Sequence, residues 1–449
     1  MQLSEKKPRR IGQFIAQASL ALVCATSTAH AQTESQAPSI EGQGFFTEKI
    51  ANVKSWAKWS GEFGMLYYSE SDGRVQAIEP AATLSAAFDG DRVWTTKLVL
   101  DSLTGASPNG ALKSNQPQTF TGPSGKDTYT VQPNKPPLDD SFKDTRVNIA
   151  TSWSQPLSRL LKMSVGLNVS NEYDYFSAGV NTSFTRETED KNRSYSLGLS
   201  YTNDQIKPVG GTPIGLATMV APPAAQPKNG STETKNTLDL LAGFSQVMSR
   251  TWILLTNLSF GQSDGYMTDP YKVVTIYDST AGATLGDPQS YIYEKRPDSR
   301  LKQSVYVASK NYISSGVLTS SYRYTTDDWD LKSHTVQVGY NFPISAKWRL
   351  EPSFRYYMQS AVDFYDFAIA DNEALPRYAT ADNRLGEMTT LAPAVKFIRK
   401  LKNERDLSLL LQYYQQTGDS SPSEAVGTQV GQDLFPDVTA FAVQVNYSF

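Results

Sequence analysis

The chain is short of the residues that build most catalytic and metal centres. Its 449 residues include one cysteine, Cys24, and two histidines, His30 and His334. A single cysteine excludes an internal disulfide. Too few thiols and imidazoles remain for an iron–sulfur cluster, a c-type haem or a histidine-rich zinc site. We therefore expect neither a cofactor nor a metal centre.

The sequence also lacks an excess of positive charge and a long apolar run. Its 42 basic and 45 acidic residues give a net charge of −3, so we expect no binding to nucleic acid. One long uncharged window, Pro208–Pro227, contains five prolines and three glycines, which would break a helix repeatedly. No transmembrane helix is expected.

The first residues have the three parts of a secretory signal peptide. Four basic residues precede the mainly apolar run Ile11–Ala25, and Ala29 and Ala31 form a small-residue cleavage site. We predict a signal peptide over residues 1–31 that directs the chain to the general secretory route. Its removal takes away four basic residues and one acidic residue, which changes the net charge from −3 to −6. Residues 32–58 would form a periplasmic leader, partly disordered or a short helix.

Residues 59–449 alternate between apolar and small polar side chains. In Arg193–Asn203, one face carries Tyr195, Leu197 and Leu199, and the other carries mainly serine, glycine and threonine. A period of two is the signature of a strand. A soluble sandwich would place large charged side chains outside, whereas the polar face here is small. The pattern predicts an all-β fold, a transmembrane antiparallel β-barrel with an apolar exterior and a polar lumen.

Sixteen such segments can be placed between Ser60 and Phe449. Short connections such as Pro343–Lys347 alternate with long ones such as Gln262–Ser299, although two of the outer connections are short. In outer-membrane barrels the short turns face the periplasm and the long loops face outside. We expect a barrel of about sixteen strands in the lipid bilayer of a Gram-negative outer membrane, with the strand number defined to within two.

The last residues form an apolar strand face that ends on an aromatic residue. Val443, Val445, Tyr447 and Phe449 share this face. The pattern resembles the terminal-strand signal that the barrel-assembly machinery reads in outer-membrane proteins. We predict that Val445, Tyr447 and Phe449 act as the barrel-assembly signal and that this machinery is a partner.

Four stretches of the sequence carry a family resemblance. They are LDSLTGASPNGA at Leu100–Ala111, EKRPDSR at Glu294–Arg300, YRYTTDDW at Tyr322–Trp329 and RYYMQSAVDFY at Arg355–Tyr365. They resemble stretches of a proteobacterial outer-membrane β-barrel family known as a domain of unknown function. The resemblance implies an outer-membrane barrel and no established activity. Members often lie near genes for a flavin-attaching transferase and thioredoxin-like proteins, which hints at a partner in extracytoplasmic redox work.

The four stretches fall at the outer ends of predicted strands and would meet at the extracellular mouth. Their acidic, amide, guanidinium and aromatic side chains suit either recognition of a polar solute or salt bridges that tie loops together. The mouth candidates are Asn109, Arg300, Asp327, Asp328, Trp329, Tyr357 and Gln359.

Charged residues also fall on the lumen-facing side of several predicted strands. Acids gather in the first three strands and bases mostly in the eleventh to fourteenth, so the two signs would occupy different walls. Such an arrangement would create a field across a water-filled pore, or a paired network in a closed one. These lumen charges are Glu62, Glu79, Lys97, Asp101, Arg323, Arg349, Glu351, Arg355, Arg384 and Lys396.

The function that follows from these features is a porin-like channel or transporter for a small polar solute. An alternative is a non-conducting structural or docking barrel that works with a periplasmic or surface partner. A third is an interfacial hydrolase, because His334 lies on the predicted outward face with Val336 and Val338. No serine and asparagine at matched outward positions are evident, so we expect that the protein is not an enzyme.

Overall fold

The computed structural model describes residues 57–105, 108–121, 128–138, 143–220, 224–230, 232–403 and 405–449. The predicted signal peptide and nearly all of the predicted leader lie outside these residues. In the described part of the chain no helix is long and apolar enough to cross a membrane.

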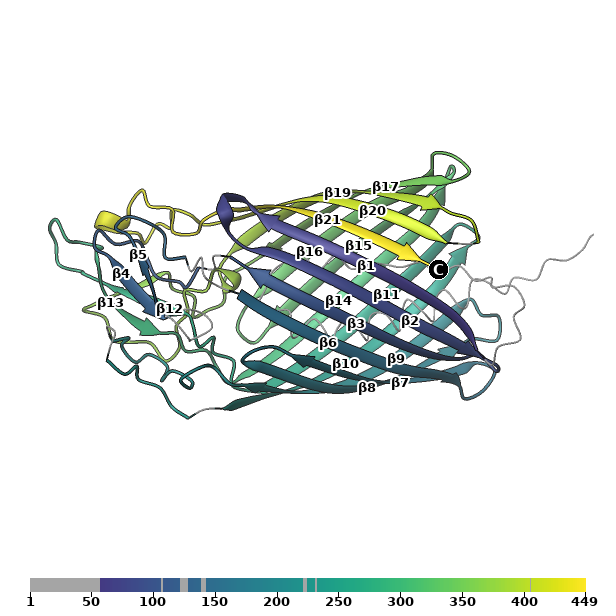
Figure 1. Ribbon diagram of the computed structural model, residues 1–449, viewed down its shortest axis with the longest axis horizontal. Helices are drawn as coiled ribbons and strands as arrows, with labels where there is room; N and C mark the ends of the chain where they lie inside the picture. Colours follow the sequence, from purple (N-terminus) through teal and green to yellow (C-terminus); the bar gives the residue numbers. More distant parts are fainter. Residues whose placement is uncertain are drawn as a thin grey trace, which may run out of the picture.

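Sixteen antiparallel strands of the described chain close into one barrel (Figure 1). Each strand pairs with its neighbours in chain order, and the last pairs with the first. This confirms the predicted all-β class, the antiparallel barrel and the strand number. The barrel strands are β1 (Lys58–Glu70), β2 (Gln76–Phe88), β3 (Arg92–Thr104), β6 (Lys143–Pro156), β7 (Leu161–Asn171), β8 (Tyr175–Glu187), β9 (Arg193–Ile206), β10 (Glu233–Ser249), β11 (Trp252–Gly265), β14 (Ser299–Ile313), β15 (Gly316–Asp327), β16 (Lys332–Pro343), β17 (Trp348–Gln359), β19 (Met388–Lys400), β20 (Asp406–Gly418) and β21 (Val438–Ser448).

The two sides of each strand differ as the sequence pattern predicts. In β9, Leu197 and Leu199 are 53% and 45% exposed on the outer surface, whereas Ser196 and Ser200 are 7% and 3% exposed. Directly paired residues of neighbouring strands share a face, so the same division continues around the barrel. The exterior is apolar and the interior is polar.

Five of the seven tryptophans lie on the outer face at one end of the barrel. Each lies within two residues of the first residue of its strand or three residues of the last one. All five are on the side of the barrel that carries the short turns. The rings of two of them meet edge to face with centroids 6.1 Å apart. Aromatic side chains concentrate at membrane interfaces because one part of the ring is apolar and another can be hydrated. The members of this belt are Trp59, Trp94, Trp153, Trp252 and Trp348.

The longer loops pack together at the opposite end and carry their own small sheets (Figure 1). We call the described residues of loops 105–142, 207–232, 266–298, 360–387 and 419–437 the cap. Its strands β4 and β5 form a hairpin, and β12 lies between β13 and β18. These elements are β4 (Gln118–Thr121), β5 (Thr128–Val131), β12 (Val273–Tyr277), β13 (Pro288–Tyr293), β18 (Ala368–Ala370), and the short 3-10 helices η2 (Asn383–Leu385) and η3 (Gly427–Gln429), with η1 (Ser71–Gly73) between β1 and β2.

Buried apolar clusters hold the cap together. Val274, Ile292 and Ile369 form one cluster, which joins β12, β13 and β18. A second cluster brings Trp329, at the outer end of β15, against Phe364 of the loop after β17. The cap therefore has cores of its own above the barrel strands.

The fourteenth strand begins later than the sequence pattern predicts. The pattern predicts this strand over Arg384–Phe397, but the strand, β19, begins at Met388. The Asp382 side chain accepts a hydrogen bond from the Arg384 backbone N–H and caps the short helix η2. Arg384 is therefore a cap residue, and its assignment as a lumen charge is wrong.

Candidate functional site in the lumen and the cap

The strand register places three of the predicted lumen acids on the inner face of β1–β3. Glu79 of β2 stands opposite Leu66 of β1, and Asp101 of β3 stands opposite Arg146 of β6. The Arg146 guanidinium donates to the Asp101 carboxylate at 3.0 Å. Arg146 is not among the lumen charges named from the sequence, although its position next to the outward-facing Val147 places it on the inner face of β6. This wall is therefore not purely acidic.

Four of the remaining lumen charges, Glu62, Lys97, Glu351 and Lys396, also lie near partners of opposite sign. Glu62 has Lys396 and Lys97 as its electrostatic neighbours. Glu351 stands directly opposite Lys396 in the register of β17 and β19. The expected separation of acids and bases onto different walls is not what the register produces.

An amide joins two further lumen charges. Asn341 donates to the Glu351 carboxylate at 2.6 Å and accepts from the Arg349 guanidinium at 2.5 Å. Arg355 is on the inner face of β17 and has Tyr357 and Tyr414 as electrostatic neighbours. Arg323, on β15, lies over the ring of Tyr306 at 5.1 Å.

The wall formed by β7–β11 has a different character, because most of its inward side chains are small hydroxyls and amides. Some pair with each other, as Ser194 and Ser245 do at 2.7 Å. Others, including the Asn168 Oδ1, the Ser170 Oγ and both amide atoms of Asn257, have no hydrogen-bond partner among the described protein atoms. Buried polar atoms are nearly always hydrogen-bonded, so these atoms are suited to water or solute in the lumen.

A recess opens in the lumen wall between β9 and β15, with a volume of about 180 Å³. Asp239, Lys302 and Arg323 line it together with small residues such as Ser259 and Ser304. Only Arg323 of these charges was singled out from the sequence. The alternation of side chains between the two faces of a strand would have been enough to place Asp239 and Lys302 on the inner face.

Four mouth candidates lie at the outer ends of β14 and β15 and tie these ends together. The Arg300 guanidinium donates to the Asp327 carboxylate at 2.5 Å and lies over the Trp329 ring at 4.1 Å. The Trp329 indole N–H donates to the Ser299 carbonyl at 2.9 Å. Asp328 accepts from the Leu301 backbone N–H. These side chains hold strand ends and loop backbone in place.

The other three mouth candidates lie elsewhere around the rim. The Gln359 amide donates to the carbonyls of Arg384 and Gly386, and the Tyr357 hydroxyl donates to the Gln359 amide oxygen. Asn109 belongs to the cap, where its amide donates to the Tyr129 hydroxyl at 2.9 Å. The structure therefore distributes the seven candidates between loop anchors and the cap instead of gathering them into one binding surface.

A buried ionic cluster in the cap joins two long loops. In its first half, two arginines donate hydrogen bonds to the same carboxylate. Arg384 donates to Asp382 at 2.6 Å and to Asp269 at 2.8 Å. Arg296 donates to the same Asp382 at 2.7 Å. Burial alone would raise the pKa of Asp382, but Arg384, Lys272 and Arg296 together hold it well below its usual value. Asp382 is thus a fixed negative centre.

The second half of the cluster surrounds a fully buried glutamate. Glu294 contacts Arg296 at 2.7 Å and accepts hydrogen bonds from the Thr380 hydroxyl and the Asp269 backbone N–H. Burial raises the pKa of Glu294 to about 7, although Arg296 acts in the opposite direction. Sequence reasoning missed this cluster because Asp269 and Arg384 are 115 positions apart.

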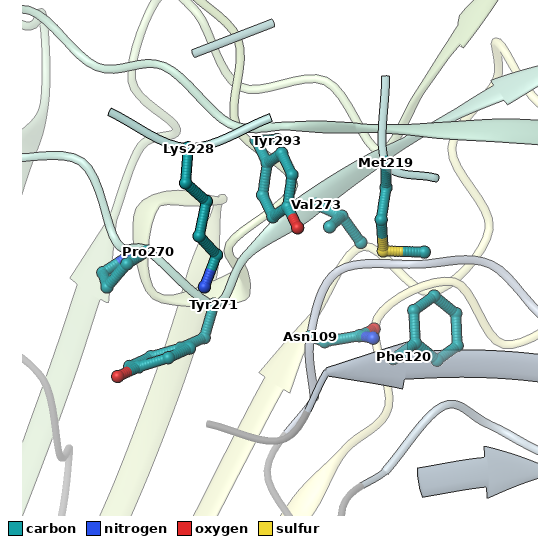
Figure 2. Close-up of a pocket in the computed structure, with 8 residues that line it drawn as sticks. All are labelled: Asn109, Phe120, Met219, Lys228, Pro270, Tyr271, Val273 and Tyr293. Atoms are coloured by element: carbon teal, nitrogen blue, oxygen red, sulfur yellow. The ribbon is translucent and has the colours of Figure 1, made fainter. Parts of the chain in front are cut away.

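The pocket between the described cap loops is too small to hold a solute. Figure 2 shows a pocket that Val273 of β12 and Tyr293 of β13 help to line, where the Lys228 side chain points between Tyr293 and Pro270. Its volume is about 10 Å³, which is room for about one water molecule. The Lys228 ammonium donates to the Val209 carbonyl at 3.0 Å. Of the two spaces, only the lumen recess has the size of a small solute.

The terminal residues lie on the outer face at the seam of the barrel. Phe449 exchanges two backbone hydrogen bonds with Gly61, each 2.9 Å long. A side-chain carbon added at Gly61 would lie 2.5 Å from the Phe449 ring, so the ring covers this glycine. Tyr447 and Val445 pair with Phe63 and Met65 of β1. The last strand therefore closes the barrel through the residues of the predicted assembly signal.

The chain belongs to a known family: the model of the family described as "Protein of unknown function (DUF3570)" matches residues 15–449. No curated protein matches the sequence.

Solved structures with a similar fold include the siderophore receptor PirA from Acinetobacter baumannii, with 10% identity over 90% of this chain and 60% of that chain and a TM-score of 0.41. PirA from Pseudomonas aeruginosa has 6% identity over 80% of this chain and 56% of that chain, with a TM-score of 0.38. The Pseudomonas putida toluene transporter TodX has 9% identity over 87% and 89% of the two chains, with a TM-score of 0.38. The chain thus spans less than two thirds of the length of the siderophore receptors.

Proposed function

We propose that this family member is an outer-membrane β-barrel that forms a porin-like channel or transporter for a small polar solute. The observation that carries the proposal is the contrast between the two faces of the barrel. The outer face is apolar and has a tryptophan belt at one end, as lipid contact requires. The inner face carries hydroxyls, amides and charges, which suit water and polar solutes.

The test is a single-channel recording on the purified, refolded full-length chain in a planar bilayer. We expect stepwise conductance whose size reports the narrowest part of the lumen. Liposome swelling with small sugars, measured in parallel, gives the solute size limit. Proteoliposomes that show neither conductance nor swelling, although the barrel is folded by heat-modifiable migration, would contradict a channel.

A docking barrel is the second candidate, and the packed cap favours it. The cap has buried cores and an ionic cluster, and Tyr68 and Tyr414 form a further buried cluster on the inner faces of β1 and β20 near the same end. A closed cap would block solutes and present a rigid surface to a partner. The Arg384→Met variant separates the two functions. If the protein is a capped channel, its conductance should rise when the cap is loosened. If it is a docking barrel, neither the wild type nor the variant should conduct.

A further inference from the structure

The charged side chains on the outer face of the barrel differ between its two ends. We call the end that carries the short turns and the tryptophan belt the short-turn end. Within one residue of a strand terminus there, the charged residues that the register places on the outer face of the described strands are arginines. At the other end this face carries both signs, as Asp264 and Lys332 show. The four arginines are Arg92, Arg186, Arg193 and Arg399.

The hairpin end between β19 and β20 brings two outward arginines together. Arg399 is directly paired with Leu407, which is 39% exposed on the outer face. The Leu401 backbone N–H donates to the Arg405 carbonyl at 2.8 Å, so the pairing of the two strands continues to Arg405. Alternation places Arg405 on the same face as Leu407, diagonally across from Arg399 at a backbone spacing of about 7–8 Å, which long side chains can bridge.

This pair of arginines lies at the level of the tryptophan belt. Arg399 is directly paired with Trp348, and its guanidinium lies over the Trp348 ring at 5.4 Å. Both Arg399 and Arg405 are exposed. Tryptophan rings concentrate where the hydrocarbon of a membrane meets its headgroups. The two guanidinium groups are therefore placed where lipid headgroups lie.

The hairpin end between β19 and β20 also has an excess of positive charge. Residues 399–406 include four basic and two acidic residues, a net charge of +2. One of the acids, Asp406, stands opposite Lys400 and belongs to the inner face. The neighbouring turn adds Lys347, whose carbonyl accepts from the Lys400 backbone N–H at 2.8 Å. The surroundings of the arginine pair thus attract an anion.

The hairpin end between β8 and β9 has the same geometry without the excess charge. Arg186 is paired with Tyr195, and Arg193 stands two residues before Tyr195 on the outer face. Residues 186–193, however, include three basic and three acidic residues. One of these acids, Glu187, forms an ion pair with Lys191 at 3.6 Å. The two hairpins lie on opposite sides of the barrel, because β8 and β9 are its sixth and seventh strands and β19 and β20 its fourteenth and fifteenth (Figure 1).

We propose that the β19–β20 end binds the headgroup of an anionic phospholipid in the membrane leaflet next to the short turns. Arg399 and Arg405 hold the lipid phosphate, whose oxygens match the planar fork of a guanidinium. The acyl chains lie against the apolar outer face of β20, where Leu407, Leu409 and Leu411 are exposed. A lipid is favoured over an acidic protein because the arginines lie on the lipid-facing surface beside this apolar face. The inference rests on the membrane barrel of the proposed function and not on conduction.

The test compares two lipids that share a glycerol phosphate core and differ in net charge, phosphatidylglycerol and phosphatidylcholine. Native mass spectrometry of the full-length protein in neutral detergent measures the affinity of each lipid by titration. We expect phosphatidylglycerol to bind about thirtyfold more tightly, because each basic residue near an anionic lipid surface contributes about a factor of five in affinity. Equal affinities would overturn the site. Tighter binding of an oligoglutamate peptide than of phosphatidylglycerol would overturn it in favour of an acidic protein partner.

Variants assign the binding to one hairpin. Arg399→Gln combined with Arg405→Gln should lower the affinity for phosphatidylglycerol about thirtyfold and leave that for phosphatidylcholine unchanged. Arg186→Gln combined with Arg193→Gln is the matched control, because it removes the same two charges from the same geometry, and it should lower the affinity less than about fivefold. Equal losses in the two double variants would overturn the assignment.

Folding and conduction are measured separately from lipid binding. Heat-modifiable migration verifies that each variant is folded, and Arg405→Gln alone, outside the strand, should still lower the affinity about fivefold. A chain that inserts into neither lipid would overturn the membrane barrel and this site with it. Insertion into both lipids with equal affinities would overturn the site alone. Selective binding of phosphatidylglycerol by a barrel that does not conduct would support the site and count against the channel.

Discussion

Replacing Arg384 by methionine should open the cap without unfolding the barrel. Arg384 is the one residue that contacts both Asp382 and Asp269 in the described part of the buried cluster. Methionine preserves much of the apolar stem but leaves Asp269 without this partner, while Asp382 keeps Arg296. Removal of one member of a buried ion pair costs about 3–5 kcal/mol, and the remaining arginine places this case near about 3 kcal/mol.

A loss of about 3 kcal/mol corresponds to a rise of about two orders of magnitude in the population of opened cap. Proteolysis reports this population when opening and closing are faster than cleavage. Proteinase K is suitable because it does not depend on the arginine that is changed. We expect cap cleavage of the folded variant about a hundredfold faster than that of the wild type, with the barrel fragment retained.

Two further variants test whether the loss of charge pairing causes the faster cleavage of the cap in Arg384→Met. Arg377→Met changes an exposed arginine of the same loop, which lies over the ring of Tyr378 at 5.0 Å, and it should leave the cleavage rate unchanged. Arg384→Lys should rescue only part of the loss, because an ammonium cannot reproduce the forked contact with two carboxylates. Cleavage of Arg384→Met at the wild-type rate would refute a stabilising role for the cluster.

Three further predictions concern assembly, pH and topology. Phe449→Ser should lower the amount of heat-modifiable barrel while export to the periplasm is unchanged, because the Phe449 ring covers Gly61 at the seam; a normal amount of assembled barrel would argue against this role. The pKa of Glu294 is raised by burial from 4.5 to about 7, so its contribution to cap stability is complete below about pH 4.5 and is lost as the pH rises through 7. Proteolysis of the cap should therefore be faster at pH 8 than at pH 5, and Glu294→Gln should flatten the profile; an unchanged slope in that variant would assign the effect to another group. A protease site between Ala281 and Gly282 should be cleaved on intact cells and one in the turn 343–347 should not; the reverse result would invert the topology.

The barrel was predictable because the two faces of its strands meet different surroundings. An apolar exterior and a small polar interior impose a period of two that survives over the whole length of each strand. The error at Arg384 shows where that signal stops. Residues 384–387 continue a strand-like alternation, but the hydrogen bond that Asp382 accepts from the Arg384 backbone N–H turns the chain into η2.

The cap was not predictable, because its contacts join residues that the sequence separates widely. Asp269 and Arg384 lie in different loops, and Thr428 reaches the backbone of Leu285 across a similar distance in the chain. Long loops have no periodicity that could reveal such partners. Arg146 and Lys302 are a different case, because both lie on predicted strands. The alternation of inward and outward side chains, followed through every strand, would have placed both in the lumen.

The register also explains why selectivity should arise locally. Charges on adjacent strands are only a few ångströms apart, so Asp101 and Arg146, or Glu351 and Lys396, largely cancel each other's fields before these reach the centre of the lumen. A solute in mid-lumen therefore meets a weak average field. At the recess, Gly261 lies between Asp239 and Lys302 in the register, so these two charges are one strand further apart than directly paired charges. A lumen in which charges stand beside charges of opposite sign would therefore distinguish small polar solutes through local contacts with the wall and not through one field across the pore.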